Sequence, residues 1–172
     1  MTVFVAFLRA VNVGGTGMLP MKDLTVLCTD LGLQDVRTYI QSGNVVFASK
    51  LPERKVQAKV EKALAEKMGK KIYVIVRTAA ELRSILAGNP FPRAKPAQVG
   101  VLFLAERAPK DLMDRLTISG PEEVKPAGRE IYVHYPLGMG RSKLKFPASV
   151  VSTTRNLNTI AKLVDMTDTQ AR

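Results

Sequence analysis

Four short polar segments of the 172-residue chain hold residue types that bind anions. They are residues 9–17, 38–47, 138–143 and 152–163. Glycine-rich backbone exposes N–H groups and arginine or lysine adds positive charge, so such segments suit phosphate and carboxylate groups. We therefore predict one site for a phosphorylated or carboxylated small metabolite, assembled from all four segments.

The predicted ligand-binding residues have three kinds of role. Arg9, Arg141, Lys143 and Arg155 are expected to neutralise the charge of the ligand. Gly14, Gly15 and Gly140 let the backbone approach it, and Tyr39, Gln41, Asn44 and Asn158 orient it. The same segments also contribute Asn12, Ser42, Ser142, Thr154, Asn156 and Lys162.

Each segment also has a structural interpretation. Residues 9–17 fit a plain connecting loop, since they match neither the dinucleotide-binding fingerprint nor the Walker A motif. Ser, Gly and Asn in 38–47 suit a tight turn, 138–143 fit a solvated basic turn, and 152–163 fit a capped surface helix. The sequence leaves both interpretations open.

Common catalytic and metal-binding patterns are absent from the sequence. The single histidine, His134, is predicted on the side of a strand opposite Ile131 and Val133, and Cys28 lies on the apolar stripe of a helix. No metal-ligand spacing occurs, and the carboxylates are dispersed among Lys and Arg. We expect no metal and no cofactor; whether the chain is an enzyme stays open.

The net charge of +11 favours polyanionic partners, because neutralising phosphates releases counterions. Residues 51–100 hold eleven Lys and Arg against four Asp and Glu, so most of the excess lies around one helix. A weak, nonspecific nucleic-acid-binding module is therefore the alternative function, although the paired aromatics of the RNP1 pattern are absent. A structural or dimerising protein is a third alternative, and the oligomeric state stays open.

The apolar N-terminal run has no basic region before it and is interrupted by Arg9, so it resembles neither a signal peptide nor a membrane span. No later segment has the length of a transmembrane helix. The single cysteine cannot form an internal disulfide. We expect a soluble cytoplasmic protein with no membrane partner.

The first half of the chain alternates strand and helix patterns. Strands are expected at 2–11, 36–40, 44–48 and 72–76, and helices from Pro20 to Gly32 and from Pro52 to Met68. Gly43 supplies the positive φ of a tight hairpin, and Gly69 ends the second helix. The β-α-β-β-α-β order predicts a ferredoxin-like (split βαβ) unit over 1–77.

The second half repeats much of this order. A capping box at Thr78 and Glu81 starts a helix, which together with the Pro-rich loop 89–98 connects the halves over 78–98. Residues 99–172 hold a strand at 99–105, a helix opened by Pro109, strands around Val124 and at 131–135, and a helix from Arg155 to about Met166. This predicts a second ferredoxin-like unit, whose last strand is not apparent and could be borrowed from the first half.

Both faces of the first strand are apolar, since Val5 and Phe7 alternate with Ala6 and Leu8. Both faces must therefore be covered, which predicts closely packed halves. The fold class is α+β, with two tandem ferredoxin-like units.

In chain order, the polar segments and their neighbours contain LRAVNVGG (8–15), MKDL (21–24), TYIQSGNVVF (38–47), GRSKL (140–144) and TTRNLNTIAKL (153–163). Together these motifs resemble a bacterial family named only as domain-of-unknown-function family 1697. The resemblance spans nearly the whole chain and implies tandem ferredoxin-like units that allow strand exchange, but it implies no activity. Two positions depart from the pattern: Ala10 replaces a frequent glycine, and Leu157 replaces the usual tryptophan, so no ring can stack there.

Overall fold

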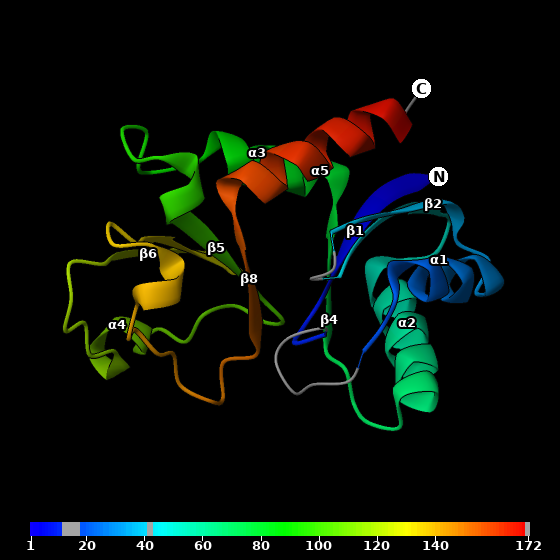
Figure 1. The fold of residues 1–172 in the computed structure, drawn as a ribbon, viewed down its shortest axis with the longest axis horizontal. Helices are drawn as coiled ribbons and strands as arrows, with labels where there is room; N and C mark the ends of the chain where they lie inside the picture. The colour runs from blue at the N-terminus through cyan, green and yellow to red at the C-terminus, as the bar shows by residue number, and fades with distance from the viewer. Residues whose placement is uncertain (12–17, 41–42, 171–172) are drawn as a thin grey trace. The chain divides into compact units, whose positions relative to one another are not determined.

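The computed structural model describes residues 1–11, 18–40 and 43–170. It contains two four-stranded antiparallel sheets with helices, so the protein is α+β as predicted (Figure 1). The chain forms two compact units, Met1–Ser84 with Lys162–Arg172, and Ile85–Ala161. In the described residues we find no helix with the length and apolar character needed to cross a bilayer.

The first sheet has the ferredoxin-like strand order β2-β3-β1-β4. The elements of this part of the chain are β1 (Thr2–Leu8), α1 (Met21–Asp30), β2 (Gln34–Tyr39), β3 (Asn44–Ser49), α2 (Glu53–Met68), β4 (Val74–Thr78) and α3 (Ala79–Ala87). The predicted element order is confirmed. Two bounds were wrong: β1 ends at Leu8 and β4 begins at Val74, because these residues form the last rung between the two strands.

Both faces of β1 are buried, as its sequence predicts. On one face, Phe4 and Leu8 join the core with Leu24 of α1 and Val60 of α2. The other face carries Phe7, which is 0% exposed. Burying a side chain of this size contributes roughly 1.5–3 kcal/mol. The faces of β1 are therefore committed to packing, which leaves the strand ends and loops for binding.

The helix ends follow the sequence signals. Thr78 and Glu81 form the predicted capping box: the Glu81 amide donates to Thr78 Oγ1 at 3.1 Å, and the Thr78 amide donates to Glu81 Oε1 at 2.9 Å. Gly69 ends α2 with φ of +70°, the left-handed conformation that glycine adopts most readily. Pro20 precedes the first residue of α1 instead of lying within its first turn.

The second sheet has the equivalent order, β6-β7-β5-β8. The elements are the 3-10 turn η1 (Pro96–Gln98), β5 (Val99–Leu104), α4 (Leu112–Arg115), β6 (Glu123–Ala127), β7 (Glu130–His134), the 3-10 turn η2 (Met139–Arg141), β8 (Ser152–Asn156) and α5 (Leu157–Gln170). Each sheet is made of four consecutive strands. The described strands are therefore not exchanged between sheets.

The predicted start of the last helix was wrong. Residues Ser152–Asn156 form β8, which pairs with β5, and α5 begins only at Leu157. Asn156 is the cap, since its Oδ1 accepts the Thr159 amide at 2.9 Å. The threonines before it favour a strand as much as a helix cap, which is why the sequence hid this strand.

The C-terminal part of α5 belongs to the first unit. Arg37 of β2 donates a side-chain hydrogen bond to the carbonyl oxygen of Met166. Arg83 of α3 forms an ion pair with Asp168 at 3.2 Å, between two exposed side chains. Two segments distant in sequence thus complete one compact unit.

We predict that Gly43→Ala destabilises the first unit more than Gly32→Ala does. Both glycines have φ of +87°, but a Cβ on Gly43 would lie 2.8 Å from Val11 Cγ2 and 2.9 Å from Leu8 Cβ, whereas one on Gly32 meets nothing within 4 Å. Strain alone costs about 1 kcal/mol, and overpacking adds roughly 1–3 kcal/mol. Urea unfolding of both variants tests this, and equal losses would contradict it.

Candidate anion-binding site

The first two predicted segments meet at one end of the first sheet. The Leu8 amide donates to the Gly43 carbonyl oxygen at 2.9 Å, and Asn44 is the strand partner of both Phe7 and Tyr39. The predicted ligand residues Asn12, Gly14, Gly15, Gln41 and Ser42 lie outside the described residues. The described part of this site consists of the residues on either side of them, Arg9, Tyr39 and Asn44.

Arg9 and Lys71 share one aromatic ring at this end. The Arg9 guanidinium carbon lies 5.8 Å and the Lys71 Nζ 4.5 Å from the centroid of the Tyr73 ring. The Arg9 amide also donates to the Tyr73 carbonyl oxygen at 3.0 Å. Leu8 and Val74 are strand partners, so Arg9, which follows Leu8, lies beside Tyr73, which precedes Val74. Cation–π attraction thus holds two positive charges near each other.

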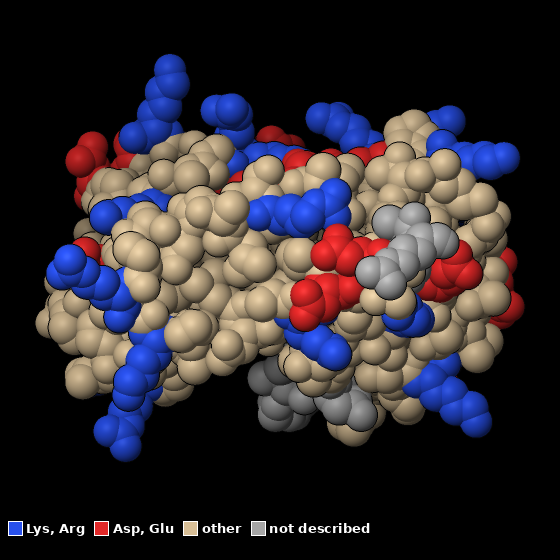
Figure 2. Space-filling view, turned by 90° about the horizontal axis from the view of Figure 1, so that it is seen from above, with Lys and Arg blue, Asp and Glu red and all other residues tan. Residues whose placement is uncertain are grey.

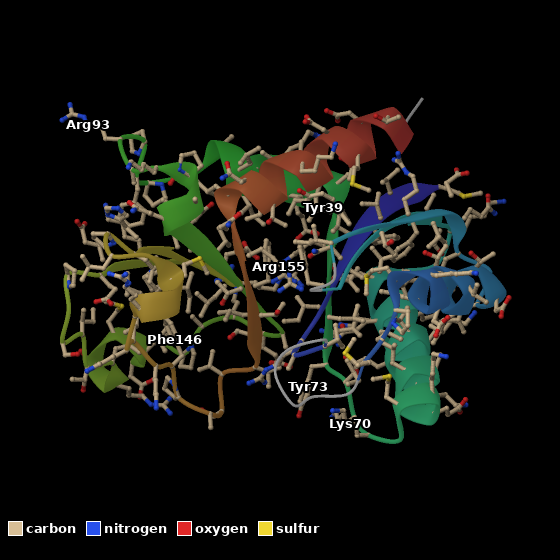
Figure 3. All side chains as sticks on the ribbon, viewed as in Figure 1. Tyr39, Lys70, Tyr73, Arg93, Phe146 and Arg155 are labelled. Atoms are coloured by element: carbon tan, nitrogen blue, oxygen red, sulfur yellow. The ribbon has the colours of Figure 1, made fainter. Side chains whose placement is uncertain are left out.

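Neither Arg9 nor Lys71 forms an ion pair with a carboxylate among the residues that the structure describes. Lys71 and its neighbour Lys70 are exposed, and Arg9 is half-buried. Figure 3 shows Tyr73 and Lys70 at the same end of β4. The arrangement is a small cluster of positive charge at a strand end, which attracts an anionic group.

Lys71 and Tyr73 were not predicted from the sequence as residues of the site. A signal was present: the ferredoxin-like order places the start of β4 beside the end of β1, so the residues before β4 must lie near Arg9. The predicted strand bound at 72 concealed it, because it placed Tyr73 inside the strand.

Tyr39 and Asn44 close the β2–β3 hairpin. Asn44 is 0% exposed, and its Nδ2 donates to the Tyr39 carbonyl oxygen at 2.9 Å. Ile40 beyond Tyr39 and Ala10 beyond Arg9 have φ of +52° and +56°, which costs non-glycine residues about 1 kcal/mol or more. This backbone conformation explains why a glycine at position 10 would be favoured.

The other two predicted segments meet in the second unit, around Gly100 of β5. A Cβ on Gly100 would lie 3.2 Å from Met139 Cε and 3.2 Å from Thr154 Cγ2. Gly140, Arg141 and Lys143 are exposed beyond this contact. The predicted segments therefore form two pairs, one within each unit.

Several polar groups of the second pair have structural partners. The Ser142 hydroxyl donates to Glu122 Oε1 at 2.7 Å and accepts the Leu144 amide at 3.1 Å. Asn156 caps α5, and Asn158 and Lys162 are exposed on that helix. The carboxylate of Glu122 beside Ser142 repels an anion, so this pair suits a negatively charged ligand less well.

Arg155 does not lie in the first turn of a helix, as its sequence suggested. It belongs to β8, where Figure 3 labels it. Its side chain is buried, with 7% exposed. Its Nη1 donates to Thr153 Oγ1 at 2.7 Å and to the Thr154 carbonyl oxygen at 2.9 Å. Desolvation by burial lowers its pKa to about 10, so it stays charged at neutral pH. Arg155 is held by its own strand instead of sharing a helix face with Asn158 and Lys162.

The single cysteine and the single histidine of the chain have different surroundings. Cys28 is 1% exposed, and burial raises the pKa of its thiol to about 12, which makes it the inert core residue that was predicted. His134 is half-buried, and its ring lies against that of Phe91, with centroids 5.6 Å apart. The predicted surface position of His134 was therefore only partly right.

The equivalent end of the second sheet carries different residues at the positions of Arg9 and Tyr73. The Leu104 amide donates to the Arg129 carbonyl oxygen at 2.8 Å, and the Ala105 amide donates to that of Val151 at 3.0 Å. These bonds repeat those of Leu8 and Arg9 in the first unit. Ala105 and Val151 therefore stand where the first unit has Arg9 and Tyr73, so the contact between Arg9 and Tyr73 has no counterpart at these two described positions.

The fold defines an α+β protein of two tandem ferredoxin-like units. The chain belongs to the family described as "Protein of unknown function (DUF1697)", which matches residues 1–132 and confirms the resemblance. It is similar to the solved structure of the conserved bacterial protein SP0830 from Streptococcus pneumoniae, with a TM-score of 0.80 and 24% identity over 96% of this chain and 98% of that one. At this identity the likeness shows the fold alone. No curated protein matches.

We predict that Arg155→Ala destabilises the second unit by roughly 2–4 kcal/mol, because it removes a buried side chain and leaves the Thr153 and Thr154 oxygens without their donor. Arg141→Ala, which removes an exposed arginine from the same unit, is the matched control and should change stability by less than about 0.5 kcal/mol. Urea unfolding compares the two. A loss no larger than that of the control would contradict the structural role of Arg155.

Proposed function

We propose that the first unit binds a phosphorylated or carboxylated small metabolite at the end of β1, through Arg9 and Lys71. The observation that carries this proposal is the convergence of both cations on the Tyr73 ring. Two like charges held close together repel each other, and a bound anion removes that repulsion. Arg9 and Lys71 take part in no ion pair among the described residues, so their N–H groups can donate hydrogen bonds to a ligand.

The donors at this cluster are complementary. The Arg9 guanidinium lies over the Tyr73 ring and takes part in no ion pair among the described residues, so it can form two parallel hydrogen bonds to phosphate or carboxylate oxygens. Lys71 adds a compact charge that adapts to different oxygen positions. Asn12, Gly14, Gly15, Gln41 and Ser42 remain in the proposal as ligand-orienting residues, on the sequence argument alone.

A small ligand is better supported than a nucleic acid. Phosphate backbones are bound by cations in a continuous stripe or groove. In Figure 2, the Lys and Arg side chains are scattered over the visible face with carboxylates among them. The cluster at Tyr73 instead consists of two cations, a number that suits one or two anionic groups. A cytoplasmic location is also part of the proposal, supported by the free thiol of Cys28.

We expect pyrophosphate to raise the melting temperature of the wild-type protein, because a ligand of the folded state stabilises it by mass action. Arg9→Ala and Lys71→Ala should each reduce affinity about tenfold, the usual effect of losing one charge-assisted hydrogen bond. Tyr73→Leu, which keeps both charges but removes the ring, should also weaken binding. Thermal shift and isothermal calorimetry at constant ionic strength give the measurement.

Lys50→Ala is the matched control, since it removes an exposed lysine that follows Ser49, the partner of Thr2, at the end of the first sheet opposite the Leu8–Val74 pair. If it weakens pyrophosphate binding as much as Arg9→Ala does, attraction is diffuse and the site is not at Tyr73. Tight, salt-sensitive binding of mixed oligonucleotides that is unaffected by Arg9→Ala would favour the nucleic-acid alternative.

A further inference from the structure

A hollow of about 400 Å³ lies on the second unit and is lined by Phe91, Pro92, Arg93, Ala94, Glu123 and His134. Its volume falls within the roughly 300–1,000 Å³ of small-molecule sites. The rings of Phe91 and His134 lie against each other, with centroids 5.6 Å apart, and give it an aromatic wall. None of the residues that line the hollow belongs to a segment of the anion-site proposal.

The aromatic wall is held in place by its own loop. The Asn89 side chain accepts the Phe91 amide at 2.9 Å and donates to the Phe91 carbonyl oxygen at 3.3 Å. Phe91 is 7% exposed. Beneath the same face of the sheet, the Tyr132 hydroxyl donates to the Ile85 carbonyl oxygen at 2.7 Å. The wall is therefore formed before any ligand arrives, which lowers the entropy cost of binding.

Two opposite charges border the hollow on one face of β6. Glu123 is the direct strand partner of His134, and Lys125 is that of Tyr132, so all four side chains point to the same face. The Lys125 Nζ lies 5.0 Å from the centroid of the Phe91 ring. Glu123 and Lys125 are exposed and take part in none of the ion pairs found among the described residues. Alternate residues of a strand are roughly 7 Å apart, so both charges can reach one small ligand.

Two other features narrow the kind of ligand. Arg93 lines the hollow and its side chain ends away from the ribbon in Figure 3, whereas the Lys125 Nζ lies over the Phe91 ring, so Lys125 is the cation placed at the aromatic wall. β6 is an edge strand, but Pro126 within it has no N–H group to pair with an added strand. The edge is therefore poorly suited to an extended peptide, and a free small molecule fits better.

We propose that this hollow binds a small zwitterion with an aromatic side chain, the chemistry of a free aromatic α-amino acid. Glu123 receives the ammonium group, Lys125 receives the carboxylate, and the side chain packs on Phe91 and His134. A ligand with both charges satisfies both β6 side chains, whereas a simple anion leaves Glu123 unpaired and repelled.

His134 reports on this site directly, because it is the only histidine of the chain. Titration of the full-length protein with L-phenylalanine at constant pH should shift its Cε1–H NMR signal saturably, through the ring current of the ligand. Phenethylamine and 3-phenylpropionate, which each lack one charge, should bind about tenfold more weakly or worse. No shift with phenylalanine, or equal affinity for the three compounds, would overturn the proposal.

The variants separate the two charges. Glu123→Gln should remove the advantage of phenylalanine over 3-phenylpropionate, and Lys125→Met its advantage over phenethylamine. Glu106→Gln and Lys110→Met are matched controls, since both residues are exposed in the same unit and neither lines the hollow. If the Glu123 and Lys125 variants behave as the controls do, the zwitterion is not recognised there.

Discussion

Strands β1 and β5 bury side chains on both of their faces, and this constraint decides where chemistry can occur. A sheet with one face in water can bind a ligand across its strands, as many ferredoxin-like nucleic-acid-binding domains do. Here Val5, Phe7, Val101 and Phe103 occupy the face that such a ligand would need, each at 0% exposure. Apart from the buried Arg77 of β4 and Arg155 of β8, the polar groups of the candidate sites lie at strand ends, in hairpins and along the edge strand β6.

The elements that were predicted correctly are those whose signals are local and redundant. The buried residues Val56, Val60 and Leu64 and the final Gly69 independently specify α2, and the reciprocal bonds of Thr78 and Glu81 specify the start of α3. The strand β8 could not be found in this way, because a Thr-rich segment next to a helix fits either a cap or a strand. Only its pairing with β5 decides between them.

The candidate sites show the same limit. Arg9 was predicted as a ligand residue from its segment, but its partners Lys71 and Tyr73 come from another loop and are brought to it by the pairing of β1 with β4. Arg155 was assigned to the first turn of a helix because the sequence hid β8, whose pairing with β5 places Arg155 in a strand. The two units illustrate the point together: equivalent backbone bonds place Arg9 and Tyr73 in one and Ala105 and Val151 in the other. The shared fold therefore preserves the positions while the side chains alone determine the chemistry.

The C-terminal part of α5 completes the unit that contains the N-terminus, through the contacts of Arg37 with Met166 and of Arg83 with Asp168. During synthesis, domains usually fold in the order in which they leave the ribosome. This chain cannot follow that order fully, since the first unit is completed by residues that follow the second unit in the sequence. The Arg9 end of the first sheet can form early, but the unit that carries it closes only after the whole second unit has been translated.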